Sequence, residues 1–475
     1  MKQFYSKIRN NDGIFVLLGH LCFFVLLVAS VYFYKERIIF ADSAFQFFKI
    51  VNFEKINIEA YRYGAILPEL PLLMAMKLGF NLKLLLITYS VAFVALYYLV
   101  FLICSQFLKN IPAALSIVFV LVLCIKESFY YPVTETQQCL IFSVLFFAIL
   151  QYPSFKSSLV QLLLAFLVIL ISFFTHPVAL YTLSFLIGYN AIDKKQLNTI
   201  KPYILILTVA VLAVAKVVLT SENSYEGKFF AELLHSPSIV LDLPNTYSKH
   251  FFLDRVNGLY FGIGAFEIIL VLHFLLKKEY FKLFWQFGFS CIFLVVTFLA
   301  YNKGDSDIMM ERAFMPLALM TSVPLMKELI ENSHRYQLLK ALFLLLIVFA
   351  SFNRIGKQGA AFRERIRFNQ ELMAKTAKLP NRKFIAESKD LQNRYYTFWS
   401  YSFETLILSS ITANIPTQTI YPANDTSQYS KYTENANNVF LGADFWLEWN
   451  IDNLNHKYFN LSTERPYAII KIDDL

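Results

Sequence analysis

Residues 82–108 read LKLLLITYSVAFVALYYLVFLICSQFL, an apolar run whose single charge, Lys83, stands near its start. About 20 consecutive apolar residues allow a helix to cross the ~30 Å hydrocarbon core of a membrane. Backbone polar groups find no water there, so a segment that crosses as a single run must bond them internally, as a helix does. The stretch therefore predicts a transmembrane helix.

Similar apolar runs recur along most of the chain. The sequence is 57% hydrophobic and only 16% charged over 475 residues, too little charge for the surface of a soluble protein of this length. The strict alternation of a membrane β-barrel is absent. We predict an α-helical polytopic membrane protein with about eleven transmembrane helices. They are expected at 14–34, 82–108, 111–126, 135–151, 159–174, 177–191, 202–219, 258–276, 281–300, 313–330 and 338–352.

The uneven distribution of lysine and arginine orients these helices. With the N-terminus in the cytoplasm, the inner connections hold roughly fourteen of these residues, whereas the short outer turns hold only Lys126, Lys303 and Arg312. Positive residues collect on the cytoplasmic side of membrane proteins. The chain is therefore predicted to be a multi-pass membrane protein with its N-terminus in the cytoplasm. Because the net charge of +9 lies mostly in short connections, it indicates topology and no nucleic-acid partner.

Two longer connections are predicted on the outer side, a first outer loop at 35–81 and a second at 220–257. The helix pair 159–174 and 177–191 depends on a turn at Thr175-His176-Pro177. Proline disfavours a helical conformation in the residue before it and suits the first turn of a new helix. A single kinked helix at this place would invert the orientation of everything that follows.

The composition changes after Phe352. Residues 353–475 contain clustered charges, three tryptophans and short alternating runs such as 467–472, which indicates a small soluble α/β domain. An odd number of crossings places this domain outside the cytoplasm, beside a transmembrane domain of residues 1–352. All five cysteines lie in or beside apolar runs, so neither disulfides nor thiol chemistry is predicted.

Ionisable residues collect at the outer ends of the predicted helices. Asp42 comes a few residues after the first helix, and Arg62 stands later in the same loop. Glu135 and His176 stand at the next outer turns, and Glu311-Arg312 precedes the tenth helix. Ionisable groups close to the hydrocarbon are costly and tend to mark functional sites. The pattern predicts one shared site at the outer face.

Each of these residues also has a structural interpretation. An acid beyond a helix end, such as Asp42, can be a solvated anchor, and an arginine can reach the lipid headgroups. Glu135 can be an N-terminal helix charge that the macrodipole favours. His176 can be a turn residue, and Glu311 can pair with Arg312.

Other polar residues give rise to further alternatives. Lys216 and Glu267 fall inside the seventh and eighth predicted helices and are expected to pair. With His20 they leave open an ion or proton path, as in a transporter. Asp305-Ser306-Asp307 in an outer turn leaves open a divalent cation as cofactor. No other cofactor is predicted, because P-loop, dinucleotide-binding, HExxH and GxSxG motifs are absent.

The order of these features resembles the GT-C superfamily of membrane glycosyltransferases, which use polyprenyl-phosphate-linked sugars. Members carry a catalytic acid shortly after the first helix, and residues 40–43, FADS, are similar, although many members have an acidic pair there. Residues 61–68, YRYGAILP, and 76–80, MKLGF, resemble the protein mannosyltransferase and aminoarabinose transferase branches. Residues 128–135, SFYYPVTE, resemble a tyrosine-rich outer turn of the superfamily. Residues 310–316, MERAFMP, resemble a Glu-Arg-aromatic-x-x-Pro element, with alanine in place of the aromatic residue.

The resemblance covers roughly residues 1–330 and implies an inverting transfer from a polyprenyl-phosphate-linked sugar to an acceptor at the outer face. The acceptor can be a lipid, a glycan or a protein. Asp42 would accept the proton of the acceptor hydroxyl. Arg312 and Arg62, with Lys303, would stabilise the phosphate charge. The residues expected to orient the substrates are Glu135, His176 and Glu311. Two alternatives remain, a flippase or transporter of an envelope glycan precursor and a non-catalytic membrane scaffold.

Overall fold

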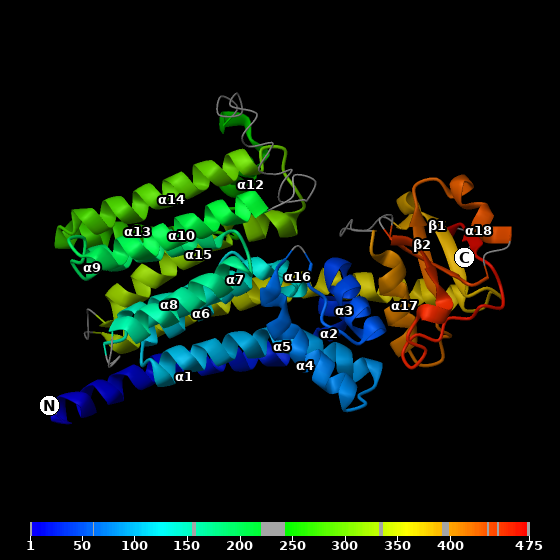
Figure 1. The fold of residues 1–475 in the computed structure, drawn as a ribbon, viewed down its shortest axis with the longest axis horizontal. Helices are drawn as coiled ribbons and strands as arrows, with labels where there is room; N and C mark the ends of the chain where they lie inside the picture. The colour runs from blue at the N-terminus through cyan, green and yellow to red at the C-terminus, as the bar shows by residue number, and fades with distance from the viewer. Residues whose placement is uncertain are drawn as a thin grey trace.

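The computed structural model describes residues 2–59, 61–153, 158–219, 243–331, 336–391, 399–434, 437–443 and 446–472. Within these ranges the chain is mostly helical. Long helices lie side by side in one bundle, and a smaller part that contains the strands lies at one end of it, where the chain ends (Figure 1).

Six helices in the described ranges are long and apolar enough to cross a membrane. The prediction of a helical protein with several segments able to span a membrane is therefore confirmed. These six are α1 (Lys2–Tyr32), α5 (Leu82–Leu102), α10 (Ile200–Leu219), α14 (Tyr280–Ala300), α15 (Asp307–Met326) and α16 (Gln337–Thr376). The other predicted crossings fall on shorter helices, α6 (Ile111–Val122), α7 (Glu135–Gln151), α8 (Ser158–Phe173), α9 (Ala179–Asp193) and α13 (Phe261–Lys277).

The structure separates α8 from α9 by a turn. α8 ends at Phe173 and α9 begins at Ala179. The carbonyl of Ser172 accepts the N–H of Thr175 at 3.1 Å and that of His176 at 3.0 Å, which closes the turn. The predicted turn at Thr175-His176-Pro177 is confirmed, and a single kinked helix is excluded.

The predicted end of the last apolar helix is wrong. The helix α16 does not stop at Phe352 but continues to Thr376, out of the bundle and into the C-terminal part (Figure 1). No proline interrupts residues 353–376, and most of them are good helix formers, so the helix continues after the apolar residues end. The predicted domain boundary at 352 therefore lies inside a continuous helix.

The predicted outer loops also contain helices. The first, 35–81, holds most of α2 (Tyr34–Ile38) together with α3 (Ala41–Phe53) and α4 (Ile66–Lys77). In the second, residues 220–242 lie outside the described ranges, and α12 (Tyr247–Asp254) follows them.

The C-terminal part contains a parallel sheet with the strand order β2-β1-β5. Its strands are β1 (Lys383–Glu387), β2 (Thr419–Ala423) and β5 (Ala468–Ile470), and α17 (Tyr401–Ile411) lies between β1 and β2 in the chain. Strands β3 (Val439–Ala443) and β4 (Trp446–Asn450) form an antiparallel pair, and α18 (Lys431–Glu434) precedes it.

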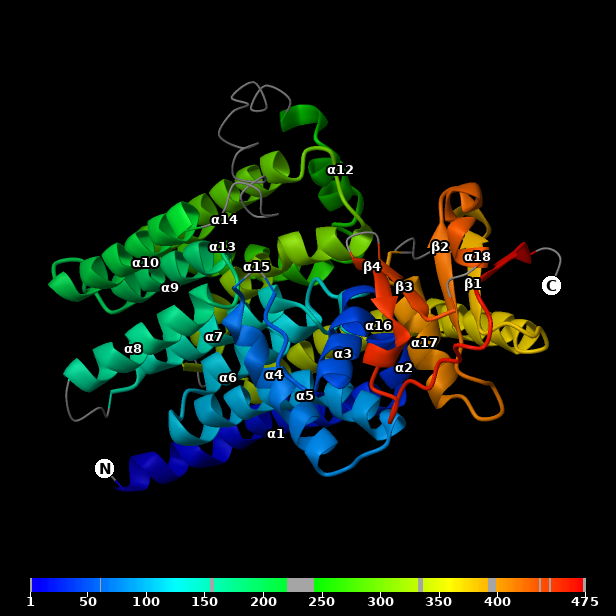
Figure 2. The same cartoon turned by 45° about the vertical axis from the view of Figure 1, so that its right-hand side comes forward.

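Aromatic side chains join α3 to this C-terminal part. Phe48 of α3 is fully buried, and its ring centroid lies 4.8 Å from that of Phe403 on α17 and 5.9 Å from that of Phe440 on β3. Figure 2 shows α3 beside α17 and the β3–β4 pair. Burying a phenylalanine stabilises a fold by about 1.5–3 kcal/mol. Helix α3 is therefore packed against residues that lie more than 300 positions later in the sequence.

The opposite end of the bundle holds a buried ionic network that the sequence did not indicate. Glu328 pairs with Lys282 at 2.7 Å and with His273 at 3.0 Å, and Lys282 also reaches Asp193 at 3.0 Å. The Glu328 side chain is only 1% exposed, so its charge is compensated inside the protein. This network joins α9, α13 and α14 to the end of α15.

Candidate functional site

Asp42 lies at the start of α3, where a carboxylate interacts favourably with the helix dipole. The hydroxyl of Tyr131 lies close enough to its carboxyl group to lower the pKa of Asp42. The side chain is neither fully buried nor fully exposed. A carboxylate that is held in place and still reachable meets the first requirement for a general base.

Arg312 reaches the same tyrosine from α15. Its guanidinium carbon lies 4.0 Å from the centre of the Tyr131 ring, and Nη2 donates to the carbonyls of Tyr131 at 3.3 Å and Val133 at 3.1 Å. The residue is 9% exposed, and its Nε is buried without a hydrogen-bond partner. Among the described residues no carboxylate lies within ion-pair distance of Arg312. A buried cation without a carboxylate partner retains its attraction for an anionic ligand.

Glu311 does not pair with Arg312 but binds the backbone of a neighbouring turn. Its carboxylate accepts the backbone N–H groups of Lys126, Glu127 and Ser128 at 3.0–3.1 Å, and the hydroxyl of Ser128 at 3.0 Å. The alternative interpretation, a local ion pair with Arg312, is excluded, because consecutive helix residues point to different sides. Glu311 holds the turn that leads to Tyr131, so its carboxylate is already occupied.

Arg62 and Glu135 form an ion pair beside this group. Nη1 of Arg62 lies 3.2 Å from a carboxylate oxygen of Glu135, and both side chains are about one-fifth exposed. Two residues later, the carbonyl of Gly64 accepts the side-chain amide of Gln138 at 2.7 Å. A Cβ at Gly64 would lie 2.2 Å from the hydroxyl oxygen of Thr175, so only glycine allows this close approach. The contact brings the Arg62 segment against the turn that carries His176.

His176 is a neutral side chain in this arrangement. Burial lowers the pKa of its imidazole well below the usual value, and the cations Arg62, Lys216 and Arg312 lower that pKa further. Its Nδ1 accepts the N–H of Val178 at 3.2 Å, which assigns the ring proton to Nε2. His176 is therefore a hydrogen-bond donor for a ligand and not an additional cation.

The pKa of Asp42 is raised by its surroundings. Burial is the largest cause and Glu135 adds to it, whereas the hydrogen bond from Tyr131 and the charges of Arg312 and Arg62 act in the opposite direction. Tyr131 and Glu135 belong to the 128–135 turn, Arg62 to the segment before α4 and Arg312 to α15. Three segments of the sequence therefore influence this carboxyl group.

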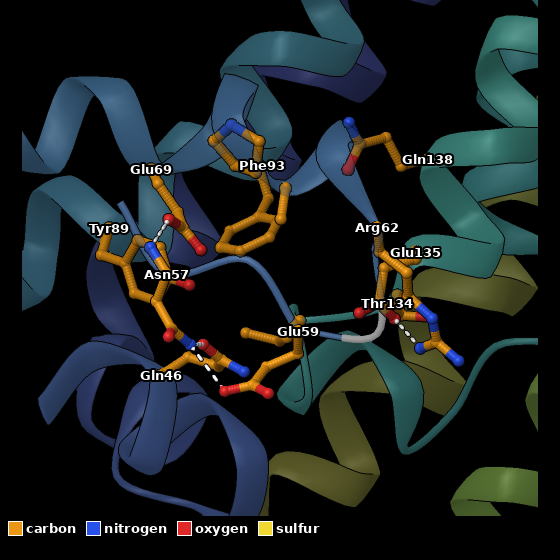
Figure 3. Close-up of a pocket in the computed structure, with 13 residues that line it drawn as sticks. Gln46, Asn57, Glu59, Arg62, Glu69, Tyr89, Phe93, Thr134, Glu135 and Gln138 are labelled. Atoms are coloured by element: carbon orange, nitrogen blue, oxygen red, sulfur yellow. Dashed lines mark hydrogen bonds and ion pairs between the residues drawn. The ribbon is translucent and has the colours of Figure 1, made fainter. Parts of the chain in front are cut away.

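A small polar pocket opens between α3, α4 and α7, beside the Arg62–Glu135 pair (Figure 3). Its volume is about 20 Å³, enough to hold about one water molecule. Burial raises the pKa of Glu69 in this pocket to about 8, so near neutral pH its carboxyl group can also donate a hydrogen bond. The polar side chains that line the pocket are Gln46, Asn57, Glu59, Arg62, Glu69, Thr134, Glu135 and Gln138.

A second, larger cavity of about 440 Å³ lies near the start of α13 and beside residues 347–354 of α16. Arg255 lines it and pairs with Asp307 at 3.1 Å. Arg354 also lines it and donates to the carbonyls of Val122 at 3.0 Å and Ile125 at 3.2 Å. Arg255 is thus paired with a carboxylate, whereas Arg354, like Arg312, donates to backbone carbonyls.

Two predictions find no support at this site. Lys303 is exposed in the 301–306 turn, and none of the described contacts joins it to Asp42. Asp307 pairs with Arg255, and the described residues contain no cluster of three His, Cys, Asp or Glu side chains that would hold a metal ion.

Tyr131, Glu69 and Asn57 belong to the site without having been predicted. Tyr131 lies in the tyrosine-rich stretch 128–135. Its position in that stretch is the feature of the sequence that could have indicated its role. Glu69 stands between two prolines in the first outer loop and looks like an ordinary loop acid. Their part in the pocket depends on contacts between segments that are far apart in the chain.

Comparison of the chain with protein-family models, with curated proteins and with solved structures found no match. The chemistry of the site therefore has to be inferred from the residues that form it.

Proposed function

We propose that the chain is an inverting glycosyltransferase of the inner membrane, which moves a sugar from a polyprenyl-phosphate donor to an acceptor at the outer face. The observation that carries this proposal is the pair of groups on Tyr131. Its hydroxyl lies close to the carboxyl group of Asp42, and its ring and carbonyl hold the guanidinium of Arg312, which has no carboxylate within ion-pair distance among the described residues. We further propose about eleven crossings with the N-terminus in the cytoplasm, which places this group on the outer side.

The reaction needs one base and one cation. The acceptor oxygen attacks the anomeric carbon, and the proton of its hydroxyl passes to the carboxylate of Asp42. The bond between the anomeric carbon and the phosphate oxygen breaks, and the polyprenyl phosphate leaves with the electron pair. Arg312 stabilises the charge that develops on that oxygen. Tyr131 keeps the carboxylate oriented, and attack opposite the leaving phosphate inverts the anomeric configuration.

The polar pocket supports recognition of hydroxyl groups. Amides and carboxyl groups accept and donate hydrogen bonds in several directions, as a sugar requires. Tyr89 and Phe93 also line this pocket, and aromatic surface suits the apolar face of a sugar ring. Because a sugar ring needs more room than one water molecule, we expect the pocket to widen on binding.

The transporter alternative needs a connected polar path through the membrane. His20 bonds the hydroxyl of Tyr98 at 2.8 Å, and Glu267 accepts the side chain of Gln286 at 3.0 Å. No described contact joins either of them to Lys216, so the predicted pair of Lys216 and Glu267 is wrong. His20, Glu267 and Lys216 each bond a different local partner, which gives no support to a path.

The proposal is tested with purified protein in lipid vesicles. The vesicles receive polyprenyl phosphate linked to different radiolabelled sugars, together with envelope lipid, glycan and protein fractions as acceptors. We expect label to enter one acceptor fraction while polyprenyl phosphate accumulates in equal amount. Absence of transfer from every donor, with protein that is folded and correctly inserted, would contradict the proposal.

The raised pKa of Asp42 predicts the pH dependence of transfer. Only the ionised carboxylate accepts a proton, so the rate should rise with pH, with a midpoint above the ordinary aspartate value of about 3.9. Glu135 raises this pKa, so Glu135→Gln should move the midpoint to lower pH. The measurement is kcat/KM for the donor between pH 4 and 9. A profile without an acid limb, or a midpoint that moves to higher pH in the variant, would contradict the assignment.

A further inference from the structure

The start of α3 is held by the C-terminal part of the chain. Phe40 precedes the helix and offers no side-chain cap. The N–H of Ala41 donates instead to Oε1 of Glu404 on α17, at 2.9 Å. An unpaired N–H in the first turn of a helix normally bonds a nearby Ser, Thr, Asp or Asn. Here the acceptor lies 363 residues later in the sequence.

Glu404 is part of a buried ionic group. Its carboxylate accepts the hydroxyl of Ser400 at 2.7 Å and pairs with the guanidinium of Arg365 on α16. Arg365 also donates to the carbonyl of Ile39 at 3.3 Å. The side chain of Arg365 is 2% exposed and that of Glu404 is fully buried. The two charged groups therefore bond the backbone on both sides of Phe40, just before Asp42.

The backbone that these two hydrogen bonds hold is strained at Ala41. Ala41 has φ = +44°, in the left-handed region that residues with a Cβ seldom adopt. Such a conformation persists only where the surroundings enforce it, and it is frequent at functional sites. Glu404 and Arg365 supply that enforcement, because they bond the N–H of Ala41 and the carbonyl of Ile39.

We propose that Glu404 and Arg365 are positioning residues for the transfer reaction: they fix the strained backbone at Ala41 and thereby aim Asp42 at Tyr131 and the acceptor. This inference rests on the proposed function. The C-terminal part then completes the active site from a distance without touching the substrates. A misplacement of a catalytic group by about 1 Å can slow a reaction by about 10²-fold, so the effect is measurable.

The test uses a charge-neutral pair of substitutions, because Glu404→Gln alone leaves the charge of Arg365 buried without a partner. The double variant Glu404→Gln/Arg365→Met keeps a hydrogen-bond acceptor near Ala41 but removes the rigid ionic contact. We expect kcat to fall by about 10–100-fold with KM for the donor within about twofold, since Arg312 and the pocket are untouched. Glu371→Gln, at an exposed ion pair on the same helix as Arg365, serves as the matched control and should behave as wild type.

A third substitution separates positioning from general destabilisation. Ala41→Gly removes the Cβ that makes the left-handed conformation costly, so the backbone needs less enforcement. Added to the double variant, it should restore kcat to within about threefold of wild type. A substitution that only repairs folding would restore the amount of folded protein and leave kcat per folded molecule low. Unchanged kcat in the folded double variant, or a loss that Ala41→Gly does not reverse, would overturn the inference.

Amide hydrogen exchange tests the positioning inference without a measurement of sugar transfer. The amides of residues 39–44 should exchange at least about tenfold faster in the double variant than in wild type or Glu371→Gln. The reason is that the ionic contact between Glu404 and Arg365, which holds this backbone in place, is lost. If wild type transfers no sugar, the proposed function fails while the exchange result still tests the anchor. If wild type transfers sugar and these amides remain equally protected, the positioning inference alone fails.

Discussion

Asp42→Asn should slow sugar transfer by about 10³-fold or more. The amide keeps the size of the side chain but accepts no proton from the acceptor hydroxyl, and a positioned base contributes about 10²–10⁴-fold to a rate. The loss should appear in kcat, because the change leaves Arg312 and the polar pocket intact. The measurement is the initial rate of transfer by purified variant and wild type in the same vesicles.

The control for this variant is Asp305→Asn, which removes an exposed acid from another outer turn. It should transfer at the wild-type rate. Binding of polyprenyl phosphate to Asp42→Asn should also stay within a few-fold of wild type, which shows that the site is still formed. Equal transfer by Asp42→Asn and wild type would remove Asp42 from the mechanism.

Arg312→Met should reduce kcat/KM for the donor by about 10²–10³-fold. Removing one preformed donor that stabilises developing negative charge typically costs this much, and Arg312 supplies the guanidinium that faces the Tyr131 ring. Arg312→Lys should recover part of the loss, because it keeps the charge but not the planar group that bonds two carbonyls and faces the Tyr131 ring.

Arg255→Met is the matched control for Arg312→Met. Arg255 is also an arginine, but it pairs with Asp307 and lines the larger cavity. It should leave kcat/KM for the donor within about twofold of wild type. If Arg255→Met causes the greater loss, the donor phosphate binds in that cavity and not beside Tyr131.

The helical architecture was predictable because lipid imposes simple rules. A crossing segment must be apolar over about 20 residues, and this requirement marked runs such as 82–108 and 281–300 directly. The same rules do not predict how far a helix continues beyond its apolar residues. The continuation of α16 to Thr376 was therefore not predicted. The helices of the first outer loop were not predicted either. Helix α3 packs against the distant C-terminal part, whereas α4 packs against α5.

The candidate site was predictable only as a set of residues. Arg62 pairs with Glu135, and the charges of Arg62, Glu135 and Arg312 influence the pKa of Asp42, so these segments are neighbours in the fold. Their partners were not predictable from local pattern. Arg312 contacts a carbonyl 181 positions earlier in the sequence, and such contacts depend on which helices are neighbours.

The direction of side chains explains the remaining errors. Glu311 and Arg312 are consecutive, so the helix turns them toward different partners, the 126–128 turn and Tyr131. Glu267 was expected to meet Lys216 but bonds Gln286 and Ser290 of the adjacent α14. Sequence gives the depth of a residue along a helix, whereas its partner is set by packing that only the fold defines.

The most direct test is a cryo-electron microscopy structure of the wild-type protein in lipid nanodiscs with bound polyprenyl phosphate, the product that leaves the reaction. We expect density for the phosphate group within hydrogen-bond distance of Arg312, on the side of Tyr131 where the carboxylate of Asp42 lies. Phosphate density in the cavity of Arg255 and Arg354, or at the end of the bundle that holds Glu328, would contradict the proposed reaction.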